Sequence, residues 1–203
     1  MAAQASPSTE VAIPEDEHKL QTPWCFWYDL KKLHKAKAAE YAASLQKVCT
    51  CHSVEDFWRA YAHMTRPSKL ETNCNIFLFR AGAGNKPMWE SYPRGGCWIL
   101  KIKKTSDVLS TMWQDLLFAA IGEIFEEPGM VGVSIARRKA IDMLSIWNED
   151  STNPEVHFGI GEKMKEVLDL GPDTMVEYKL FNDALHDGST FRNARAFVFA
   201  PVS

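Results

Sequence analysis

Residues 86–91 contain a tryptophan and a glutamate side by side, Trp89 and Glu90. The segment follows a Gly-rich turn and lies between two stretches that are predicted to be strands. A tryptophan ring can stack on a flat heterocycle, and a carboxylate can accept hydrogen bonds from N–H groups at the edge of that heterocycle. The pair therefore predicts a site for one purine base on a loop between two strands.

Other side chains could complete such a site. Tyr41 is equally consistent with a core position and with a second wall around the base, whereas Trp147 is typical of a core residue and less so of a wall. The basic run at residues 137–139 is typical of a solvated turn. Its Arg138 and Lys139 could also bind phosphates attached to the base, because cations, and planar guanidinium groups above all, bind phosphate oxygens.

Two further motifs predict no cofactor. Gly82 and Gly84 are not followed directly by a helix start, which a phosphate-binding loop requires, so we interpret them as a simple turn. Cys49, Cys51 and His52 resemble half of a zinc site, but the sequence contains no second matching pair. We therefore predict neither a metal nor another cofactor.

An enzymatic alternative depends on residues 122–130, which nearly match the centre of the Nudix hydrolase box. In that box, glutamates on a helix hold a divalent metal against a diphosphate, and the candidates here are Glu123, Glu126 and Glu127. The box also contains a Gly, a Glu and an Arg at the positions of Val108, Gln114 and Gly122. Glutamates near the end of an amphipathic helix usually form its exposed face, so the hydrolase is the less favoured hypothesis.

The composition restricts the class of protein. A length of 203 residues, with 46% hydrophobic and 24% charged residues, is typical of one soluble globular domain. A net charge of −3 argues against a protein that covers nucleic-acid backbone through bulk positive charge. Five cysteines without a secretory signal predict free thiols in a reducing compartment. We expect a location in the cytoplasm, with the nucleus as an additional one.

The elements that must position the site follow the pattern of an α+β domain. Residues 1–17 are small and polar and predict a disordered tail, which leaves residues 18–203 as the folded domain. Apolar periodicity predicts helices over 54–61, 107–125 and 154–170. Their start signals are Ser53 with Asp56, Ser106 or Asp107, and Asn153 with Pro154. Strands are predicted at 24–30, 75–80, 97–104, 131–136, 143–147, 175–182 and 196–200, with a further short apolar alternation at 41–51.

Three helices among seven or eight mostly hairpin-linked strands predict helices packed on one face of an antiparallel sheet. From about His18 to its end, the chain also resembles the eukaryotic translation initiation factor 4E family, the mRNA 5′-cap-binding proteins. The resemblance depends on the joint order of the motifs at residues 26–28, 53–58, 86–90, 95–98, 121–123 and 145–147. It implies a curved eight-stranded antiparallel sheet with three helices on its convex face, and a non-enzymatic monomer.

The resemblance implies roles for single residues toward a 7-methylguanosine cap. Trp89 matches one aromatic wall, and Tyr41 falls on the other wall, where most of the family has Trp. Glu90 matches the carboxylate that accepts hydrogen bonds from guanine N1–H and N2–H₂. Trp147 matches the tryptophan that touches the methyl group. Arg138 matches the family's phosphate-binding arginine.

Some positions depart from the family pattern. Two lysines that assist the phosphate-binding arginine fall on Ala140 and Met143, so Lys139 or Arg137 is predicted to substitute. These departures and Tyr41 resemble the divergent branch called 4E homologous protein. In the C-terminal loop, Ser189 matches the family's phosphorylation position, with Arg192 nearby, where nucleotides beyond the cap would be contacted.

The resemblance also implies a docking site for a helical motif, as in the scaffold factor 4G or in 4E-binding repressors. The matching positions are His18, Leu20, Val54, Trp58, Gln114, Asp115 and Phe118. The prediction is therefore a protein of translation initiation or its repression that binds capped mRNA and a helical partner. The alternatives are the hydrolase and a family member that has lost cap binding and acts as a protein-binding module.

Overall fold

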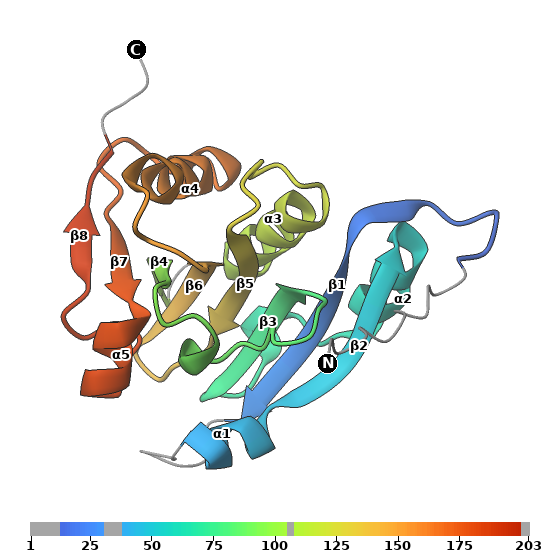
Figure 1. The fold of residues 1–203 in the computed structure, drawn as a ribbon, viewed down its shortest axis with the longest axis horizontal. Coiled ribbons are helices and arrows are strands. Elements are labelled where there is room, and N and C mark those ends of the chain that lie inside the picture. Colours follow the sequence, from blue (N-terminus) through green and yellow to red (C-terminus); the bar gives the residue numbers. More distant parts are fainter. Residues whose placement is uncertain (1–12, 31–37, 105–107, 200–203) are drawn as a thin grey trace, which may run out of the picture.

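The computed structural model describes residues 13–30, 38–104 and 108–199 (Figure 1). Their strands form one curved, open sheet in which every pairing is antiparallel. The strand order is β2-β1-β3-β5-β6-β4-β7-β8. The strands are β1 (Lys19–Leu30), β2 (Gln46–Ser53), β3 (Cys74–Arg80), β4 (Gly96–Lys103), β5 (Met130–Ala136), β6 (Ile141–Asn148), β7 (Val176–Leu180) and β8 (Arg195–Phe197). The predicted eight-stranded antiparallel sheet is confirmed.

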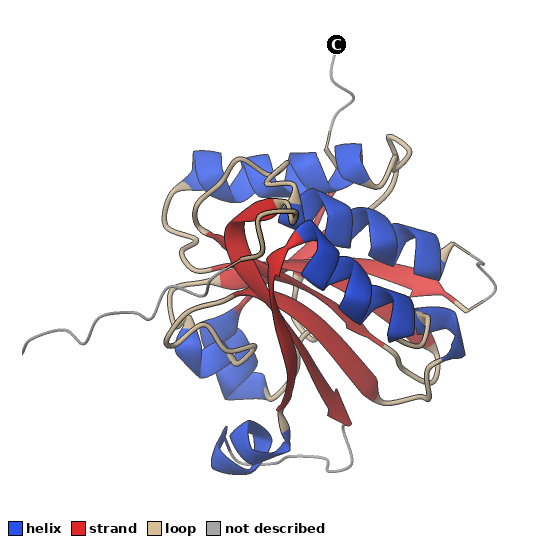
Figure 2. Cartoon of the chain, turned by 90° about the vertical axis from the view of Figure 1, so that its right-hand side faces the viewer, coloured by secondary structure: helices blue, strands red, loops and turns tan. Residues whose placement is uncertain are grey.

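Three long helices lie side by side over one face of this sheet (Figure 2). They are α2 (Val54–His63), α3 (Leu109–Ile121) and α4 (Pro154–Val167). Two short helices that the sequence pattern did not predict, α1 (Ala38–Ser44) and α5 (Phe181–Asp187), lie apart from these three (Figure 1). Single 3-10 turns are η1 (Pro67–Lys69) and η2 (Trp89–Ser91). The predicted α+β class is confirmed, with five α-helices in the described part of the chain where three were expected.

Both faces of the sheet bury apolar side chains, because successive residues of a strand point to opposite faces. In β3, Ile76 and Leu78 belong to the cluster beneath α2, α3 and α4, which we call the helix-side cluster. Phe77 and Phe79 belong to a smaller group, the loop-side cluster. Its buried members are Leu45, Phe77, Phe79, Tyr92, Cys97, Ile99, Val131, Met143, Trp147 and Phe181.

The start of α2 shows the predicted capping. The Oγ of Ser53 accepts a hydrogen bond from the backbone N–H of Asp56 at 3.0 Å. In return, the Asp56 carboxylate accepts from the backbone N–H of His52 at 2.9 Å. The first bond satisfies a backbone donor that the first helical turn leaves unpaired, and the second satisfies the donor of the residue before the cap. The predicted caps of α3, Ser106 and Asp107, lie outside the described residues.

Several predicted elements end earlier than expected, and α4, which was predicted to reach residue 170, ends at Val167. The helix predicted to reach residue 125 ends at Ile121, because Glu123 takes a left-handed conformation (φ 55°) and Ile124 N–H closes the end on Ala119 O. The strand predicted at 175–182 ends at Leu180, where α5 begins. Its Phe181 and Ala184 are both buried, a spacing that suits a helix.

The predicted disordered tail lies largely outside the described residues, since 1–12 are not described. Glu17, within the predicted tail, is described and accepts hydrogen bonds from Ser53 and Arg59. Among the described helices, none is long and apolar enough to cross a membrane.

We predict that protonation of His157 destabilises the fold. The imidazole of His157 is buried in α4, with ring centroids 5.0 Å from Trp98 and 3.9 Å from Tyr178. Burial lowers the pKa of His157, because the charged form loses hydration. Stability from a lowered pKa is present above the unfolded pKa of about 6.5 and is lost as the pH falls. The free energy of unfolding should therefore decrease from pH 7 to pH 5 in urea titrations.

The test variant is His157→Phe, which keeps an aromatic ring and removes the titrating imidazole. It should flatten the dependence between pH 7 and pH 5. An unaltered slope in His157→Phe would contradict the assignment.

Candidate functional site

Trp89 and Glu90 lie in η2, a single turn between β3 and β4. The turn is closed by hydrogen bonds from Ser91 N–H to Met88 O (3.1 Å) and from Tyr92 N–H to Trp89 O (3.0 Å). The Trp89 ring is half-buried against the loop-side cluster, while Glu90 is exposed. No described residue donates a hydrogen bond to the Glu90 carboxylate. Packing thus holds the ring, and the carboxylate remains available to a ligand.

Tyr41 lies in α1 and is joined to the same loop. Its hydroxyl donates a hydrogen bond to Pro87 O at 3.2 Å. Burial, together with the negative charges of Asp29 and Glu90, raises the pKa of Tyr41 well above its usual range. Tyr41 and Glu90 are therefore neighbours in space, although 48 positions separate them in the chain.

Arg138, in the turn after β5, adds a cation to this region, where its charge acts on Tyr41. The guanidinium donates from Nη2 to Asn75 Oδ1 (2.7 Å) and from Nη1 to Arg137 O (2.8 Å). Burial lowers the pKa of Arg138. Arg137 pairs with Asp142 at 2.6 Å. Lys139 is exposed and has no hydrogen-bond or ion-pair partner in the described part of the chain, so it is the more available of the two predicted substitutes.

Trp147 is a core residue that lies beneath this region. Its ring is 4.5 Å from that of Phe181 and 5.2 Å from that of Phe79, and its Nε1 donates to Ser134 Oγ at 2.9 Å. It shares the loop-side cluster with Trp89. Contact with the methyl group of a ligand stays a prediction.

The sequence pattern assigned no role to Trp27, Asp29 or Asn75. The alternation of β1 places Trp27 and Asp29 on one face of the sheet, and these residues pair with Phe77 and Asn75 of β3. Trp27 packs against the loop-side cluster, as Trp89 does, and Asp29 accepts a hydrogen bond from Asn75. The period-two pattern of β1 was the signal that could have indicated them.

Ser189 and Arg192 lie in the turn that follows α5, which packs against η2. The Ser189 side chain is buried, and its Oγ accepts from the backbone N–H of Arg192 at 3.0 Å. The carbonyl of Arg192 accepts from the buried ammonium of Lys179 at 2.5 Å. A phosphate on Ser189 would require this turn to open.

The predicted partner-binding residues gather on the helix-covered face. Trp58 is 47% exposed, and its ring centroid lies 5.5 Å from that of Phe118 in the neighbouring helix α3. Gln114 accepts a hydrogen bond from Tyr61 at 3.2 Å. His18 bonds to Glu55 at 2.7 Å, and this bond raises the pKa of His18. Of the remaining residues, Leu20 is buried, while Val54 and Asp115 are half-buried.

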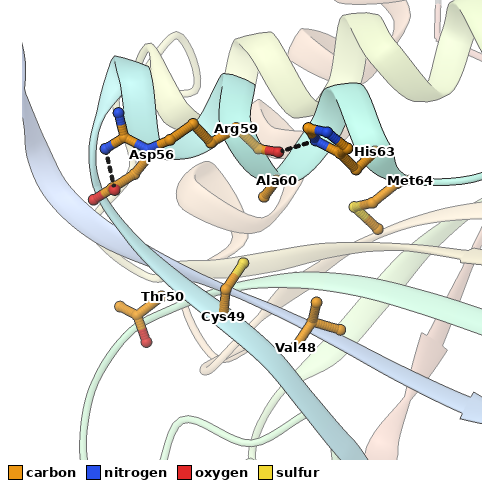
Figure 3. Close-up of a pocket in the computed structure, with 8 residues that line it drawn as sticks. All are labelled: Val48, Cys49, Thr50, Asp56, Arg59, Ala60, His63 and Met64. Carbon is orange, nitrogen blue, oxygen red and sulfur yellow. Dashed lines mark hydrogen bonds and ion pairs between the residues drawn. The ribbon is translucent and has the colours of Figure 1, made fainter.

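A separate groove of about 390 Å³ lies between the edge strand β2 and α2 (Figure 3). Its lining residues are Val48, Cys49, Thr50, Asp56, Arg59, Ala60, His63 and Met64. Figure 3 shows the thiol of Cys49 pointing toward Ala60 and Met64 of the helix side. None of the predicted base-binding residues contributes to this groove.

The residues of the hydrolase hypothesis do not assemble a metal site. The Glu123 carboxylate accepts hydrogen bonds from Arg80 Nη1 (2.8 Å), Arg80 Nη2 (2.5 Å) and Thr22 Oγ1 (2.6 Å). Within residues 13–30, 38–104 and 108–199, no three His, Cys, Asp or Glu side chains are grouped so that they could hold a metal ion. The geometry therefore offers the hydrolase hypothesis no support.

Comparison with known proteins links the chain to one family. The family model for eukaryotic initiation factor 4E matches residues 19–196. The eukaryotic translation initiation factor isoform 4E of Capsicum annuum is 35% identical over 185 residues, which cover 90% of this chain and 88% of that protein. Eukaryotic translation initiation factor 4E-4 of Caenorhabditis elegans is 34% identical over 188 residues, which cover 91% of this chain and 85% of that protein.

Solved structures agree with this family. The complex of C. elegans eIF4E-3 with the 4E-binding protein Mextli and a cap analog matches with a TM-score of 0.73 at 30% identity, covering 84% of this chain and 96% of that chain. Ascaris suum eIF4E-3 in complex with an m7G cap matches with a TM-score of 0.74 at 30% identity. The match covers 92% of this chain and 99% of that chain.

We predict that the bond from Tyr41 to Pro87 helps to hold α1 against the loop. Tyr41→Phe should lower the free energy of unfolding by roughly 1 kcal/mol, the usual net value of one hydrogen bond, and should speed amide exchange in α1. Urea unfolding and hydrogen exchange measure the two effects. The control is Tyr28→Phe, because the 39% exposed Tyr28 has no hydroxyl bond within the described residues. Equal behaviour of the two variants would contradict the role of this bond.

Proposed function

Because the chain belongs to the eukaryotic initiation factor 4E family, we propose that it binds the 7-methylguanosine cap of mRNA and docks a helical protein partner, in translation initiation or its repression. Of the solved relatives, Ascaris suum eIF4E-3 is in complex with an m7G cap, and C. elegans eIF4E-3 is in complex with a cap analog and the 4E-binding protein Mextli. The observation in this chain that carries the proposal is the convergence of Tyr41, Glu90 and Arg138 around the Trp89 loop.

The cap base would lie between the rings of Trp89 and Tyr41. Methylation at N7 makes guanine cationic, and each electron-rich ring would contribute a cation–π energy of roughly 0.5–2 kcal/mol. This term is absent for unmethylated guanine, so the rings favour the methylated base. The exposed carboxylate of Glu90 would accept from N1–H and N2–H₂, a paired contact worth about 1–3 kcal/mol of base discrimination.

The phosphates would be bound by Arg138 and Lys139. The two side chains differ in how they are held: Arg138 is fixed by Asn75 and by a backbone carbonyl, whereas Lys139 is exposed. A pre-oriented guanidinium loses less side-chain entropy on binding than an exposed lysine does. We therefore assign the directional phosphate contact to Arg138 and a more general charge contribution to Lys139.

The partner would dock on the helix-covered face through Trp58 and Phe118. An amphipathic helix buries its apolar face in such a site, and a large exposed aromatic ring is typical of the residues that dominate binding. This surface lies on the face of the sheet opposite the loop-side cluster. Cap and partner could therefore be bound at the same time.

We predict that 7-methyl-GTP quenches the tryptophan fluorescence of the chain and that GTP does so only at much higher concentration. Trp89→Leu should remove nearly all binding, because it removes one stacking face. Glu90→Ala should remove most of it, with a loss of about 1–3 kcal/mol in binding free energy. Glu155→Ala, which removes an exposed carboxylate of α4, is the matched control and should bind normally.

Other outcomes would favour the alternatives. Equal quenching by GTP and 7-methyl-GTP would reject specific cap binding, and absence of both responses would favour a protein-binding module that has lost the cap. Magnesium-dependent release of a nucleoside monophosphate or diphosphate would favour the hydrolase.

We predict that Trp58→Ala weakens binding of a synthetic helical peptide based on a 4E-binding motif by about 2 kcal/mol, or about 30-fold. The expected reason is loss of the largest exposed ring on the docking face. Isothermal titration calorimetry measures the change, and Met175→Ala, which removes another exposed apolar side chain, is the control. Equal losses in the two variants would place the peptide elsewhere.

A further inference from the structure

Asp29 is a buried carboxylate with no role in the proposed contacts to base, phosphate or partner. It lies on β1, is 2% exposed and accepts two hydrogen bonds. Ser44 Oγ donates to its Oδ1 at 3.1 Å, and Asn75 Nδ2 donates to its Oδ2 at 3.1 Å. Burial of a carboxylate is costly unless it is hydrogen-bonded and near a cation. The two hydrogen bonds therefore stabilise the Asp29 carboxylate, and they also restrain Ser44 and Asn75.

Asn75 connects Asp29 to Arg138, the residue that we propose binds the phosphates. Asn75 donates to Asp29 and accepts from Arg138 Nη2 at 2.7 Å. An ionised carboxylate can only accept and a guanidinium can only donate, so these two neighbours determine the orientation of the Asn75 amide. Asp29 also opposes the effect of burial on the pKa of Arg138. The guanidinium is thus oriented by Asn75, and the nearby negative charge of Asp29 partly offsets the cost of burying its positive charge.

Ser44 connects Asp29 to the helix that carries Tyr41, the proposed aromatic wall. Ser44 is the last residue of α1, and its Oγ also lies 2.8 Å from Tyr41 O. Residues 39–44, the part of α1 whose side chains are described, include no buried side chain, and Tyr41 is half-buried. The buried Leu45 that follows this short helix and the polar contacts to Asp29 and to Pro87 help to hold it in place.

We propose that Asp29 is a positioning residue that holds Arg138 and the helix of Tyr41 as one unit, and so sets the spacing between the aromatic wall and the phosphate-binding cation. The proposal rests on the proposed function, since it concerns the same site. It predicts that the loss of Asp29 reduces the gain in affinity that phosphates provide. If Asp29 were needed only for stability, its loss would weaken the binding of all ligands equally.

The test compares affinities for 7-methylguanosine and 7-methyl-GTP by fluorescence titration in Asp29→Ala and Asp29→Asn. Asp29→Ala removes both hydrogen bonds and should lower the 7-methyl-GTP affinity about tenfold, with a smaller loss for 7-methylguanosine. Asp29→Asn keeps an oxygen for Asn75 and a polar group for Ser44, so it removes mainly the charge. It should fold normally and should still reduce the ratio of the two affinities.

Glu123→Gln is the matched control. Glu123 is also a largely buried carboxylate that bonds to an arginine and a hydroxyl, but its partners are Arg80 and Thr22. This variant should leave both affinities unchanged. An unchanged affinity ratio in Asp29→Asn, or equal losses for both ligands in Asp29→Ala, would overturn the proposal.

A second measurement needs no ligand. Hydrogen exchange of residues 38–44 in the unliganded chain should be faster in Asp29→Ala than in the wild type and unchanged in Glu123→Gln. Unaltered exchange in Asp29→Ala would overturn the link between Asp29 and α1. If the wild type failed to prefer 7-methyl-GTP over GTP, the proposed function would fail, and this exchange would still decide whether Asp29 holds the helix.

Discussion

The structure depends on burial of one sheet on both faces. Three long helices cover one face, and the loop-side cluster with η2 and α5 covers part of the other. Each strand therefore contributes alternate residues to two cores, as Ile76 and Phe77 do in β3. The protein therefore has two surfaces, one supported by the helix-side cluster and the other by the loop-side cluster. Trp58 is exposed on the first surface, and Trp89 is half-buried on the second.

Polar side chains at the edge of the loop-side cluster decide what this surface can recognise. Glu90 has no hydrogen-bond donor among the described residues, while Arg138 is held by Asn75 and a backbone carbonyl. Tyr41 is joined to the Trp89 loop through Pro87. An acceptor, a cation and two rings are complementary to a cationic purine that carries phosphates. The proposed function follows from this complementarity within a family that the comparisons identify.

Elements with local physical causes could be predicted well. The capping of α2 by Ser53 and Asp56 and the start of α4 at Asn153 and Pro154 were correct, because such signals act within one helical turn. The short helices α1 and α5 were missed. They have little apolar periodicity, and α1 depends on contacts with strands and loops that are distant in the chain.

The sequence by itself determined the fold class, the family and the position of Trp89 and Glu90 on one loop between two strands. These features depend on residue types and on their order along the chain. Only the tertiary structure decided that Asp29, Asn75 and Arg138 form one connected network. The register of β1 against β3 places Asp29 beside Asn75. Register depends on the packing of whole strands against the two cores, and the sequence of a single strand does not specify it.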